Sequence, residues 1–398
     1  MLTAVVGINW GDEGKGRMVD LLSADYDIVC RYQGGNNAGH TVINDHGKIV
    51  LNLLPSGISR EGTVNVMGNG MVIDLEHLVH EIQSLRDKGI HIGPDNLKIS
   101  DKAVICLPWH KMQDIMEEDR LKDKKFGSTR RGIGPVYADK YMKKAIRMGD
   151  LFAPDKLPEK VADLTEWKNL TVRGYGHEPV KAEDILAWLH EFGDPIKPYI
   201  TDVSDYLYDA ATAGENIMFE AQLGALRDIE FGIYPYTSSS CTLAGYATIG
   251  AGIPGLKLDK TIGIMKAYSS CVGEGPFTVE MFGDEAEALR RAGGEYGAAT
   301  GRPRRVGAFD IPASRYGVRM HGADCIALTK MDVLSYMDKI PVCVAYDING
   351  EITEKFPVGE RLNAAKPVFE YMEGFGDISG CRKPEDLPKA AMDYIRYL

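Results

Sequence analysis

A glycine-rich segment near the N-terminus combines residue types that bind phosphate. Residues 7–16 read GINWGDEGKG and follow the apolar run Leu2 to Val6. A strand, a glycine-rich turn and a lysine at the start of a helix present backbone amides and a positive charge to an anion. The usual G-x-x-x-x-G-K-[ST] pattern is altered, because Asn9 replaces its first glycine and Gly16 its hydroxyl residue. We predict phosphate contacts from Gly11, Gly14, Lys15 and Gly16.

The same loop carries a carboxylate, Asp12, at a place where phosphate would repel it. Two kinds of chemistry can accommodate it. The first is a Mg²⁺ ion held between Asp12 and the phosphates. The second is a general base that a neighbouring cation such as Lys15 keeps ionised. A base beside a γ-phosphate indicates that a substrate other than water is deprotonated there.

Two further regions are suited to anions. The loop 33–41 reads QGGNNAGHT, and its amides, its hydroxyl and His40 can hydrogen-bond or protonate a phosphate oxygen. Basic residues are concentrated in 121–132, LKDKKFGSTRRG, and in 300–307, TGRPRRVG. Because glycines flank both clusters in an acidic protein, we expect local anion sites.

The remaining sequence predicts an α/β fold with a large, mainly parallel central sheet flanked by helices, in a single domain over 1–398. Apolar runs that alternate with helical patterns are typical of a parallel sheet covered on both faces. Candidate strands are 2–8, 27–32, 49–53, 64–68, 103–107, 216–220, 261–267, 324–329 and 341–346. Candidate helices are 15–24, 75–88, 109–119, 156–168, 181–191, 197–213 and 308–320. The stretch 120–200 is more polar and helical, which indicates an insertion or subdomain.

Composition argues against several classes of protein. The chain has 398 residues and a net charge of −11, whereas binding to nucleic acid requires a basic surface. No apolar run approaches the roughly 18 residues of a membrane span, so we expect no membrane partner. The 7 cysteines are scattered and form no C-x-x-C pair. This pattern favours the reducing cytoplasm over a disulfide framework or a zinc site.

A set of motifs in a fixed order resembles the adenylosuccinate synthetase family. The motifs are WGDEGKG, RYQGGNNAGHT, GIGPVYADK, FGIYPYTSSS, TGRPRR and LTKMDVL, and the resemblance covers essentially the whole chain. Members of the family join L-aspartate to inosine monophosphate (IMP) with hydrolysis of GTP, on the AMP branch of purine biosynthesis. The resemblance implies that Asp12 removes the N1 proton of the hypoxanthine and that the 6-oxygen attacks the γ-phosphate. The aspartate amine then displaces phosphate from the 6-phosphoryl intermediate.

The resemblance also implies roles for individual residues. The catalytic residues are Asp12 and His40, and Mg²⁺ is bound by Asp12 and by the carbonyl of Gly39. GTP or its phosphates are bound by Gly11, Gly14, Lys15, Gly16, Thr41, Lys330 and Asp332. IMP is bound by Asn37, Thr129, Lys143, Gln222, Ser238 and Arg302. Aspartate is bound by Thr300, Arg302 and Arg304, since arginine meets a carboxylate with two donors. A homodimer is expected, with Lys143 completing the partner's site.

Several positions depart from the family pattern. Where the family reads F-E-G-A-Q-G, residues 219–224 read FEAQLG, so Gln222 has moved one place and Leu223 stands in its position. Lysine replaces an arginine at position 143, Cys271 replaces another, and Ala299 replaces a hydroxyl residue. The family's C-terminal S-x-G-P-x-R guanine-binding segment has no counterpart before Leu398. We therefore expect either a shortened chain or an incomplete guanine pocket.

Two alternatives to this interpretation stay open. One is a related ligase for a different purine nucleotide, as in phage relatives that lack the acid at position 12; Asp12 argues against it and the shifted Gln222 for it. The other is a GTP-binding regulatory protein without ligase activity, in which the arginines of TGRPRR have no evident role. Omission of aspartate from an assay separates the regulatory protein from a ligase.

Overall fold

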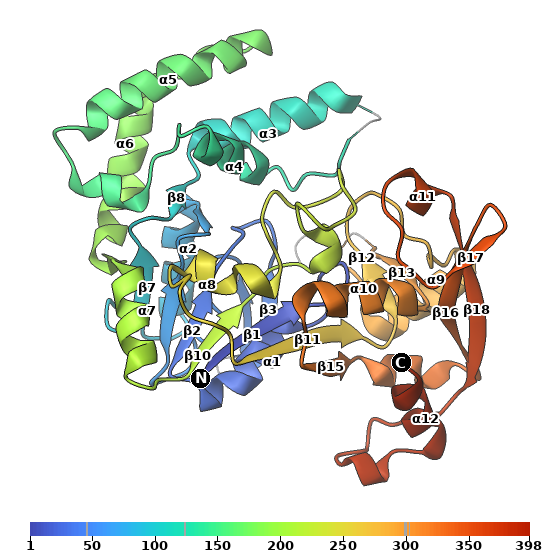
Figure 1. The fold of residues 1–398 in the computed structure, drawn as a ribbon. Helices are drawn as coiled ribbons and strands as arrows, with labels where there is room; N and C mark the ends of the chain where they lie inside the picture. The colour runs from blue at the N-terminus through green and yellow to red at the C-terminus, as the bar shows by residue number, and fades with distance from the viewer. Residues whose placement is uncertain (45–46, 123–124, 298–300, 302) are drawn as a thin grey trace. The chain divides into compact units, whose positions relative to one another are not determined.

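The computed structural model describes residues 1–44, 47–122, 125–297, 301 and 303–398 (Figure 1). The chain divides into two compact units. The first unit comprises Met1–Val6, Lys15–Gln222 and Ser238–Thr261, and the second comprises Gly7–Gly14, Leu223–Thr237 and Ile262–Leu398. The phosphate-loop motif therefore changes unit between Gly14 and Lys15.

The first unit contains a parallel sheet with the strand order β1-β10-β2-β5-β7-β9. Its strands are β1 (Leu2–Gly7), β10 (Ile217–Glu220), β2 (Ile28–Arg31), β5 (Val64–Met67), β7 (Leu97–Ser100) and β9 (Ile200–Thr201). The register aligns Leu2 with Ile217, Ile217 with Ile28 and Ile28 with Val64. Such crossover pairing requires helices on the faces of the sheet. The predicted mainly parallel α/β sheet is confirmed.

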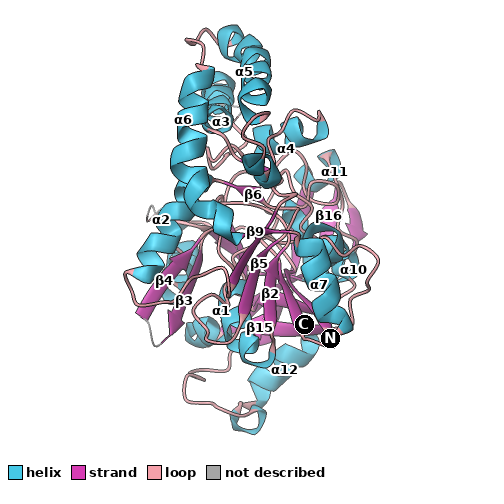
Figure 2. Ribbon diagram, turned by 90° about the vertical axis from the view of Figure 1, so that its left-hand side faces the viewer, coloured by secondary structure: helices cyan, strands magenta, loops and turns pink. Residues whose placement is uncertain are grey.

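Helices cover both faces of this sheet (Figure 2). On one face α7 (Val203–Thr212) and α8 (Ala247–Ala251) pack on the strands, and on the other face α2 (Leu75–Arg86) does so. Successive residues of β5 point to opposite faces of the sheet. Val66 therefore lies in the hydrophobic core beneath α7 and α8, and Met67 lies in the core beneath α2. Because both faces are buried, most residues of these strands are apolar, which made β1, β2, β5 and β10 recognisable in the sequence. The short strands β7 and β9 were not among the expected strands.

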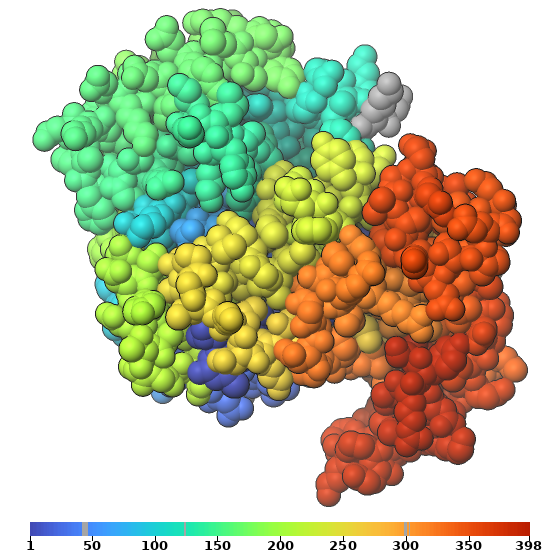
Figure 3. Space-filling view, in the orientation of Figure 1, coloured from blue at the N-terminus to red at the C-terminus, as the bar shows by residue number. Residues whose placement is uncertain are grey.

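A helical segment follows within the same unit and covers part of the face shown in Figure 3 (turquoise to green). Its helices are α3 (Pro108–Leu121), α4 (Ile133–Tyr141), α5 (Leu157–Gly174) and α6 (Ala182–Gly193). Smaller elements of the unit are α1 (Lys15–Leu22), the hairpin β3 (His40–Asn44) and β4 (Gly47–Leu51), and the pair β6 (Val72–Ile73) and β8 (Val104–Ile105). Within the described ranges, no helix has the length and apolar character that a membrane crossing requires.

The second unit combines a parallel strand pair with antiparallel sheets. The parallel pair is β11 (Lys260–Lys266), which begins at the end of the first unit, and β15 (Cys325–Thr329). The antiparallel strands are β12 (Ser269–Cys271), β13 (Arg305–Gly307), β16 (Lys339–Ile348), β17 (Glu351–Thr353) and β18 (Ala365–Glu373), and β14 (Phe309–Asp310) pairs in parallel with β16. The helices are α9 (Gly283–Gly293), α10 (Ile311–His321), α11 (Glu360–Asn363) and α12 (Lys389–Tyr397).

The predicted helix 197–213 is wrong in its first part. A 3₁₀ turn, Asp194–Tyr199, and the short strand β9 precede α7. The reason is the cap at Asp202, whose carboxylate accepts hydrogen bonds from the amides of Ser204 and Asp205. A side chain that satisfies these amides fixes the helix start at Val203.

Asp310 provides a pH-dependent contribution to stability. Its buried carboxylate caps α10 at the amide of Ala313 and accepts the hydroxyl of Tyr346. Burial raises the pKa of Asp310 to about 6, above about 3.9 for an unfolded aspartate. The native state then binds more protons than the unfolded state between these values, so the free energy of unfolding falls as the pH rises through this window.

We expect Asp310→Asn to remove this dependence. The free energy of unfolding of the wild type minus that of the variant should decrease by about 2 kcal/mol between pH 4 and pH 7. Urea unfolding at intervals across this range measures the difference, in which other titrating groups cancel. Parallel profiles for the two proteins would contradict a raised pKa at Asp310.

Candidate active site

The phosphate loop has an unusual backbone that one of its own acids holds in place. Gly11, Asp12 and Gly14 have φ values of 102°, 59° and 100°. The carboxylate of Glu13, whose residue is 3% exposed, accepts hydrogen bonds from the amides of Gly11 at 2.8 Å and of Asn9 at 3.1 Å. Glu13 therefore shapes the loop from inside, by satisfying amides that the tight turn removes from water.

Asp12 has a different environment from its neighbour Glu13. Its carboxylate is 31% exposed, and its Oδ2 atom lies 3.2 Å from Nη2 of Arg304. Aspartate tolerates the left-handed backbone conformation better than most residues do. The two acids of the loop thus have separate functions, because Glu13 stabilises the turn while Asp12 faces a cation.

Arg304 belongs to a buried charge network in the same unit. Its Nη1 donates to Oε2 of Glu295 at 2.9 Å, and Oε1 of Glu295 accepts from Lys266 at 2.6 Å and from Tyr268. The Lys266 and Glu295 side chains are 5% and 1% exposed. Burial alone would raise the pKa of Glu295, but the Lys266 ammonium holds it below its usual value. The network therefore keeps an ionised carboxylate behind Arg304.

The predicted guanine-recognition residues, Lys330 and Asp332, are both exposed at the end of β15. Lys330 has a φ of 63°, and its Nζ donates to the carbonyl of Gly293 at 3.1 Å. The preceding Thr329 donates its hydroxyl to the carbonyl of Glu13 at 2.8 Å. The second unit thus brings the TKMD motif into contact with the phosphate loop.

His40, in the first unit, is paired with a fully buried acid that the sequence analysis left without a role. Its Nδ1 lies 2.8 Å from Oε1 of Glu220, and Glu220 also accepts from the amide and the hydroxyl of Ser56. A carboxylate at Nδ1 places the proton there and leaves Nε2 as the reactive nitrogen. Burial would raise the pKa of Glu220, but His40 and the buried guanidinium of Arg31 lower it below its usual value. Glu220 thus orients the imidazole.

Gly16, where a usual phosphate loop has a hydroxyl residue, lies against the predicted acid. A Cβ atom at this position would meet the Cβ of His40 at 2.8 Å and Oγ of Ser56 at 3.2 Å. Any side chain here would displace His40, so the departure from the usual motif follows from the position of the histidine. Lys15 opens α1 and is 4% exposed.

Gln222 is buried and holds the glycine-rich loop of the first unit. Its amide donates to the carbonyl of Gly35 at 3.0 Å and accepts from the Gly35 amide at 3.1 Å. A Cβ on Gly34, which has a φ of 79°, would lie 1.7 Å from Oε1 of Gln222. Both amide atoms are engaged, so contact of Gln222 with a base requires these bonds to change. Its role as an IMP ligand stays a prediction.

The other predicted IMP and phosphate residues are accessible. Ser238 is half-buried, and its hydroxyl lies 3.0 Å from that of Ser240, which donates to Gln33 at 2.8 Å. Thr129, Lys143 and Gly39 are exposed, whereas Asn37 and Thr41 are half-buried. Thr300 and Arg302, the remaining predicted aspartate ligands, lie outside the described residues.

Glu13, Glu220 and Glu295 are the functional candidates that reasoning from sequence missed. Glu220 and Glu295 are each a single acid between apolar or glycine residues, and Glu13 directly follows Asp12, so no spacing distinguishes them from surface charges. For Glu220 a signal existed, because an acid that ends a fully apolar strand must be buried with a partner.

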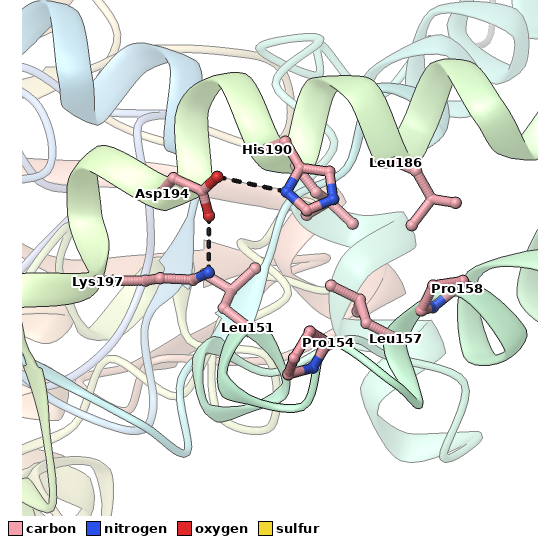
Figure 4. A pocket seen from close by; sticks show the side chains of 9 residues that line it. Leu151, Pro154, Leu157, Pro158, Leu186, His190, Asp194 and Lys197 are labelled. Atoms are coloured by element: carbon pink, nitrogen blue, oxygen red, sulfur yellow. Dashed lines mark hydrogen bonds and ion pairs between the residues drawn. The ribbon is translucent and has the colours of Figure 1, made fainter.

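A small pocket in the helical segment is not this site. It is lined by Leu151, Leu157, Leu186 and neighbouring residues, with the side chains of His190, Asp194 and Lys197 hydrogen-bonded at its edge (Figure 4). Its free volume is about 30 Å³, room for about one water molecule. Small-molecule sites are roughly 300–1,000 Å³, and the predicted site residues do not line this pocket.

The donor set fits a magnesium ion that a nucleotide helps to hold. No group of three or more histidine, cysteine or acidic side chains that would enclose a metal occurs among the described residues. Magnesium is usually bound through one or two carboxylates together with substrate phosphates. A single partly exposed carboxylate in the phosphate loop, that of Asp12, agrees with this mode of binding.

Comparisons with known proteins agree with the motifs. The family model for adenylosuccinate synthetase matches residues 4–398. The adenylosuccinate synthetase of Caldanaerobacter subterraneus subsp. tengcongensis is 44% identical over 400 residues, covering 100% of this chain and 94% of the relative. That of Streptococcus gordonii is 43% identical over 395 residues, covering 98% and 91%.

Solved structures give the same result. The fully ligated adenylosuccinate synthetase from Plasmodium falciparum matches with a TM-score of 0.91 and 36% identity, over 99% of this chain and 93% of that one. The cyanophage S-2L succinoaminodeoxyadenylate synthetase, bound to dGMP and dATP, shares the fold with a TM-score of 0.57 and 20% identity, over 82% and 83%. The sequence relatives and the family model confirm the resemblance, and the chain belongs to the adenylosuccinate synthetase family.

Proposed function

We propose that the chain is a GTP-dependent ligase that joins L-aspartate to IMP and forms adenylosuccinate, GDP and phosphate. The observation that carries this proposal is the pair of Asp12 and Arg304. An acid in the phosphate loop can serve as a base, and its contact with an arginine of the TGRPRR loop places that base beside a group suited to bind a carboxylate. A GTP-binding regulatory protein would need no carboxylate-binding arginine.

The reaction divides into two steps. In the first, Asp12 removes the N1 proton of IMP, and the 6-oxygen, now carrying negative charge, attacks the γ-phosphorus and releases GDP. In the second, the amine of aspartate attacks C6, the C6–O bond breaks, and phosphate leaves as the amine loses a proton. Phosphorylation is required because a carbonyl oxygen is a poor leaving group, and a base held beside the phosphates makes the attack effectively intramolecular.

His40 serves as the acid toward the phosphates of GTP in this mechanism. With its Nδ1 proton directed at Glu220, Nε2 is the nitrogen that exchanges a proton or hydrogen-bonds with a phosphate oxygen. Lys15 and the loop glycines bind the phosphates, and Asp332 accepts the N1 and N2 protons of guanine. We propose that Asn37, Thr129 and Ser238 bind IMP.

A magnesium ion would be held by the carboxylate of Asp12 and the carbonyl of Gly39. When bound, it neutralises charge on the phosphates and polarises them toward attack. The 7 free cysteines support a reducing compartment, and we place the reaction in the cytoplasm.

We also propose a homodimer in which Lys143 reaches the nucleotide of the partner. Lys143 is exposed with a φ of 63°, and the adjacent Tyr141 and Met142 are 75% and 58% exposed. Large apolar side chains exposed together are typical of an interaction surface.

We expect Lys143→Ala to weaken IMP binding far more than GTP binding, since it removes one phosphate partner. Separate determination of the two KM values measures this, with Lys144→Ala, an exposed neighbouring lysine, as the matched control. An equal loss for both nucleotides would exclude the role of Lys143.

Arg304→Leu should raise the KM for aspartate by roughly 10- to 100-fold, because one or two charge-assisted hydrogen bonds of about 1.5–3 kcal/mol are lost. The KM values for GTP and IMP serve as internal controls. An unchanged aspartate KM would remove Arg304 from the aspartate site.

Phosphate release from GTP with Mg²⁺, with IMP or aspartate omitted in turn, tests the proposed function when product absorbance is recorded alongside. We expect release and product only with all substrates present. Release that is indifferent to aspartate would identify a GTPase or a regulatory protein instead.

A further inference from the structure

Glu295 stands out in the second unit as a nearly inaccessible acid that the proposed mechanism does not use. It follows the C-terminal end of α9, where Gly294 has a φ of 63° and the Glu295 amide bonds the carbonyl of Arg290 at 2.9 Å. An ionised carboxylate in such a place is costly unless several partners satisfy it. Lys266, Tyr268 and Arg304 provide those partners.

Glu295 is bound to Arg304 through both backbone and side chain. The amide of Arg304 donates to the carbonyl of Glu295 at 2.9 Å, and a β-bridge joins Tyr296 to Pro303. The side-chain bond from Nη1 to Oε2 runs alongside. Glu295, Arg304 and the residues next to them are therefore joined at three places, through two backbone contacts and one side-chain hydrogen bond.

The three nitrogens of the Arg304 guanidinium have different partners, and these show which donors Glu295 leaves available to a substrate. Glu295 takes Nη1, Nη2 faces Asp12 at 3.2 Å, and Nε is buried without a hydrogen-bond partner among the described residues. Nε and Nη2 form one edge of a guanidinium, and such an edge binds a carboxylate with two parallel bonds. A buried donor without a partner is destabilising. A carboxylate that binds this edge would supply Nε with the acceptor that it lacks.

We propose that Glu295 is a positioning residue that fixes the guanidinium of Arg304 for the carboxylate of L-aspartate, with Lys266 and Tyr268 holding Glu295 in place. This inference rests on the proposed ligase function. Glu295 does not touch the substrate itself. Without it, Nη1 is released, Arg304 can turn toward Asp12, and the two-donor edge is no longer presented.

The test uses a variant that removes both members of the buried ion pair. Glu295→Gln alone leaves Lys266 as an unpaired buried charge and risks unfolding, so Lys266→Met/Glu295→Gln is the informative protein. We expect its aspartate KM to rise about tenfold, the loss of roughly one charge-assisted hydrogen bond, while its KM for IMP stays within about twofold. Glu280→Gln is the matched control, because Glu280 pairs with the neighbouring Arg305, and it should leave the aspartate KM unchanged.

A positioning role predicts that the effects do not add. In an Arg304→Leu background the double substitution should cause no further rise in aspartate KM, whereas a merely structural role would multiply the two effects. An unchanged aspartate KM in the double variant, or full multiplication in the triple variant, would overturn the proposal.

A crystal structure of the ligand-free double variant separates this inference from the ligase function. We expect Arg304 to lose its present rotamer, and an Arg304 side chain in its original place would overturn the inference even if the wild type is an active ligase. If the wild type forms no product, the proposed function fails, and the rotamer of Arg304 still decides whether Glu295 positions it.

Discussion

Asp12→Asn should reduce kcat by about 10³-fold, because a positioned general base contributes roughly 10²–10⁴. The substitution is well suited to the question. Asp12 has a φ of 59°, and asparagine is among the few residues that adopt this conformation readily. The backbone of the phosphate loop is therefore retained while the charge and the basicity are lost.

Steady-state rates at saturating GTP, IMP and aspartate measure the effect. Asp347→Asn is the matched control, since Asp347 lies near the end of β16 in the same unit and accepts a hydrogen bond from the amide of Gly350; it should retain full activity. A loss of less than tenfold for Asp12→Asn would show that another group removes the proton. Asp12→Ala is a poorer probe, because alanine strains the left-handed position.

Glu220→Gln should lower both stability and activity. Glu220 and Arg31 are each fully buried, and burial lowers the pKa of Arg31 while Glu220 is foremost among the charges that oppose this. Removal of this acid leaves the buried Arg31 guanidinium with less compensating charge and Ser56 and His40 without their acceptor. We expect a loss near 3 kcal/mol, at the low end of the about 3–5 kcal/mol for breaking a buried pair. Because the imidazole of His40 also loses its charged acceptor, we expect kcat to fall roughly 10- to 100-fold.

The variant Arg31→Met/Glu220→Gln separates these two effects. It removes both buried charges, so most of the unfolding free energy should return, as measured by urea unfolding. The low kcat should persist, because His40 still lacks a carboxylate at Nδ1. Recovery of activity together with stability would show that Glu220 acts on the fold alone.

Many strands and helices of the first unit were predictable because the residue patterns that determine them lie close together in the sequence. The strands β1, β2, β5 and β10 are mostly apolar, and capping by Asp74 marks a helix start that the sequence displays. The phosphate loop and the loop 33–41 were recognisable from glycines and polar residues at the ends of strands. These features do not depend on distant parts of the chain.

The antiparallel part of the second unit was not predictable in the same way. The strand β18 reads AKPVFEYME and is mostly exposed, so neither apolar content nor alternation identifies it. Its pairing with β16 over Lys339–Ile348 fixes it as a strand, and that pairing is a tertiary fact. The helix α9 begins and ends with glycine, and it was not among the helices expected from the sequence.

The candidate site was predictable in its surface residues and not in its buried supports. Asp12, His40 and Arg304 lie in recognisable loops, whereas Glu220 and Glu295 act on them from inside. Which acid supports which residue depends on the arrangement of strands, as with His40 and Glu220, which are separated by most of the first unit in sequence. The spacing of residues along the chain does not predict such a contact.

The pairing of β1 with β10 has a consequence for how the protein is made. Leu2 aligns with Ile217, so a mostly apolar strand leaves the ribosome more than two hundred residues before its sheet neighbour. At about 5–20 residues per second, that interval lasts roughly 10–40 s. Throughout it the strand is an exposed, aggregation-prone segment of the nascent chain. The sheet of the first unit must therefore close late in synthesis, and the yield of folded protein should depend on whatever shields those first residues in the meantime.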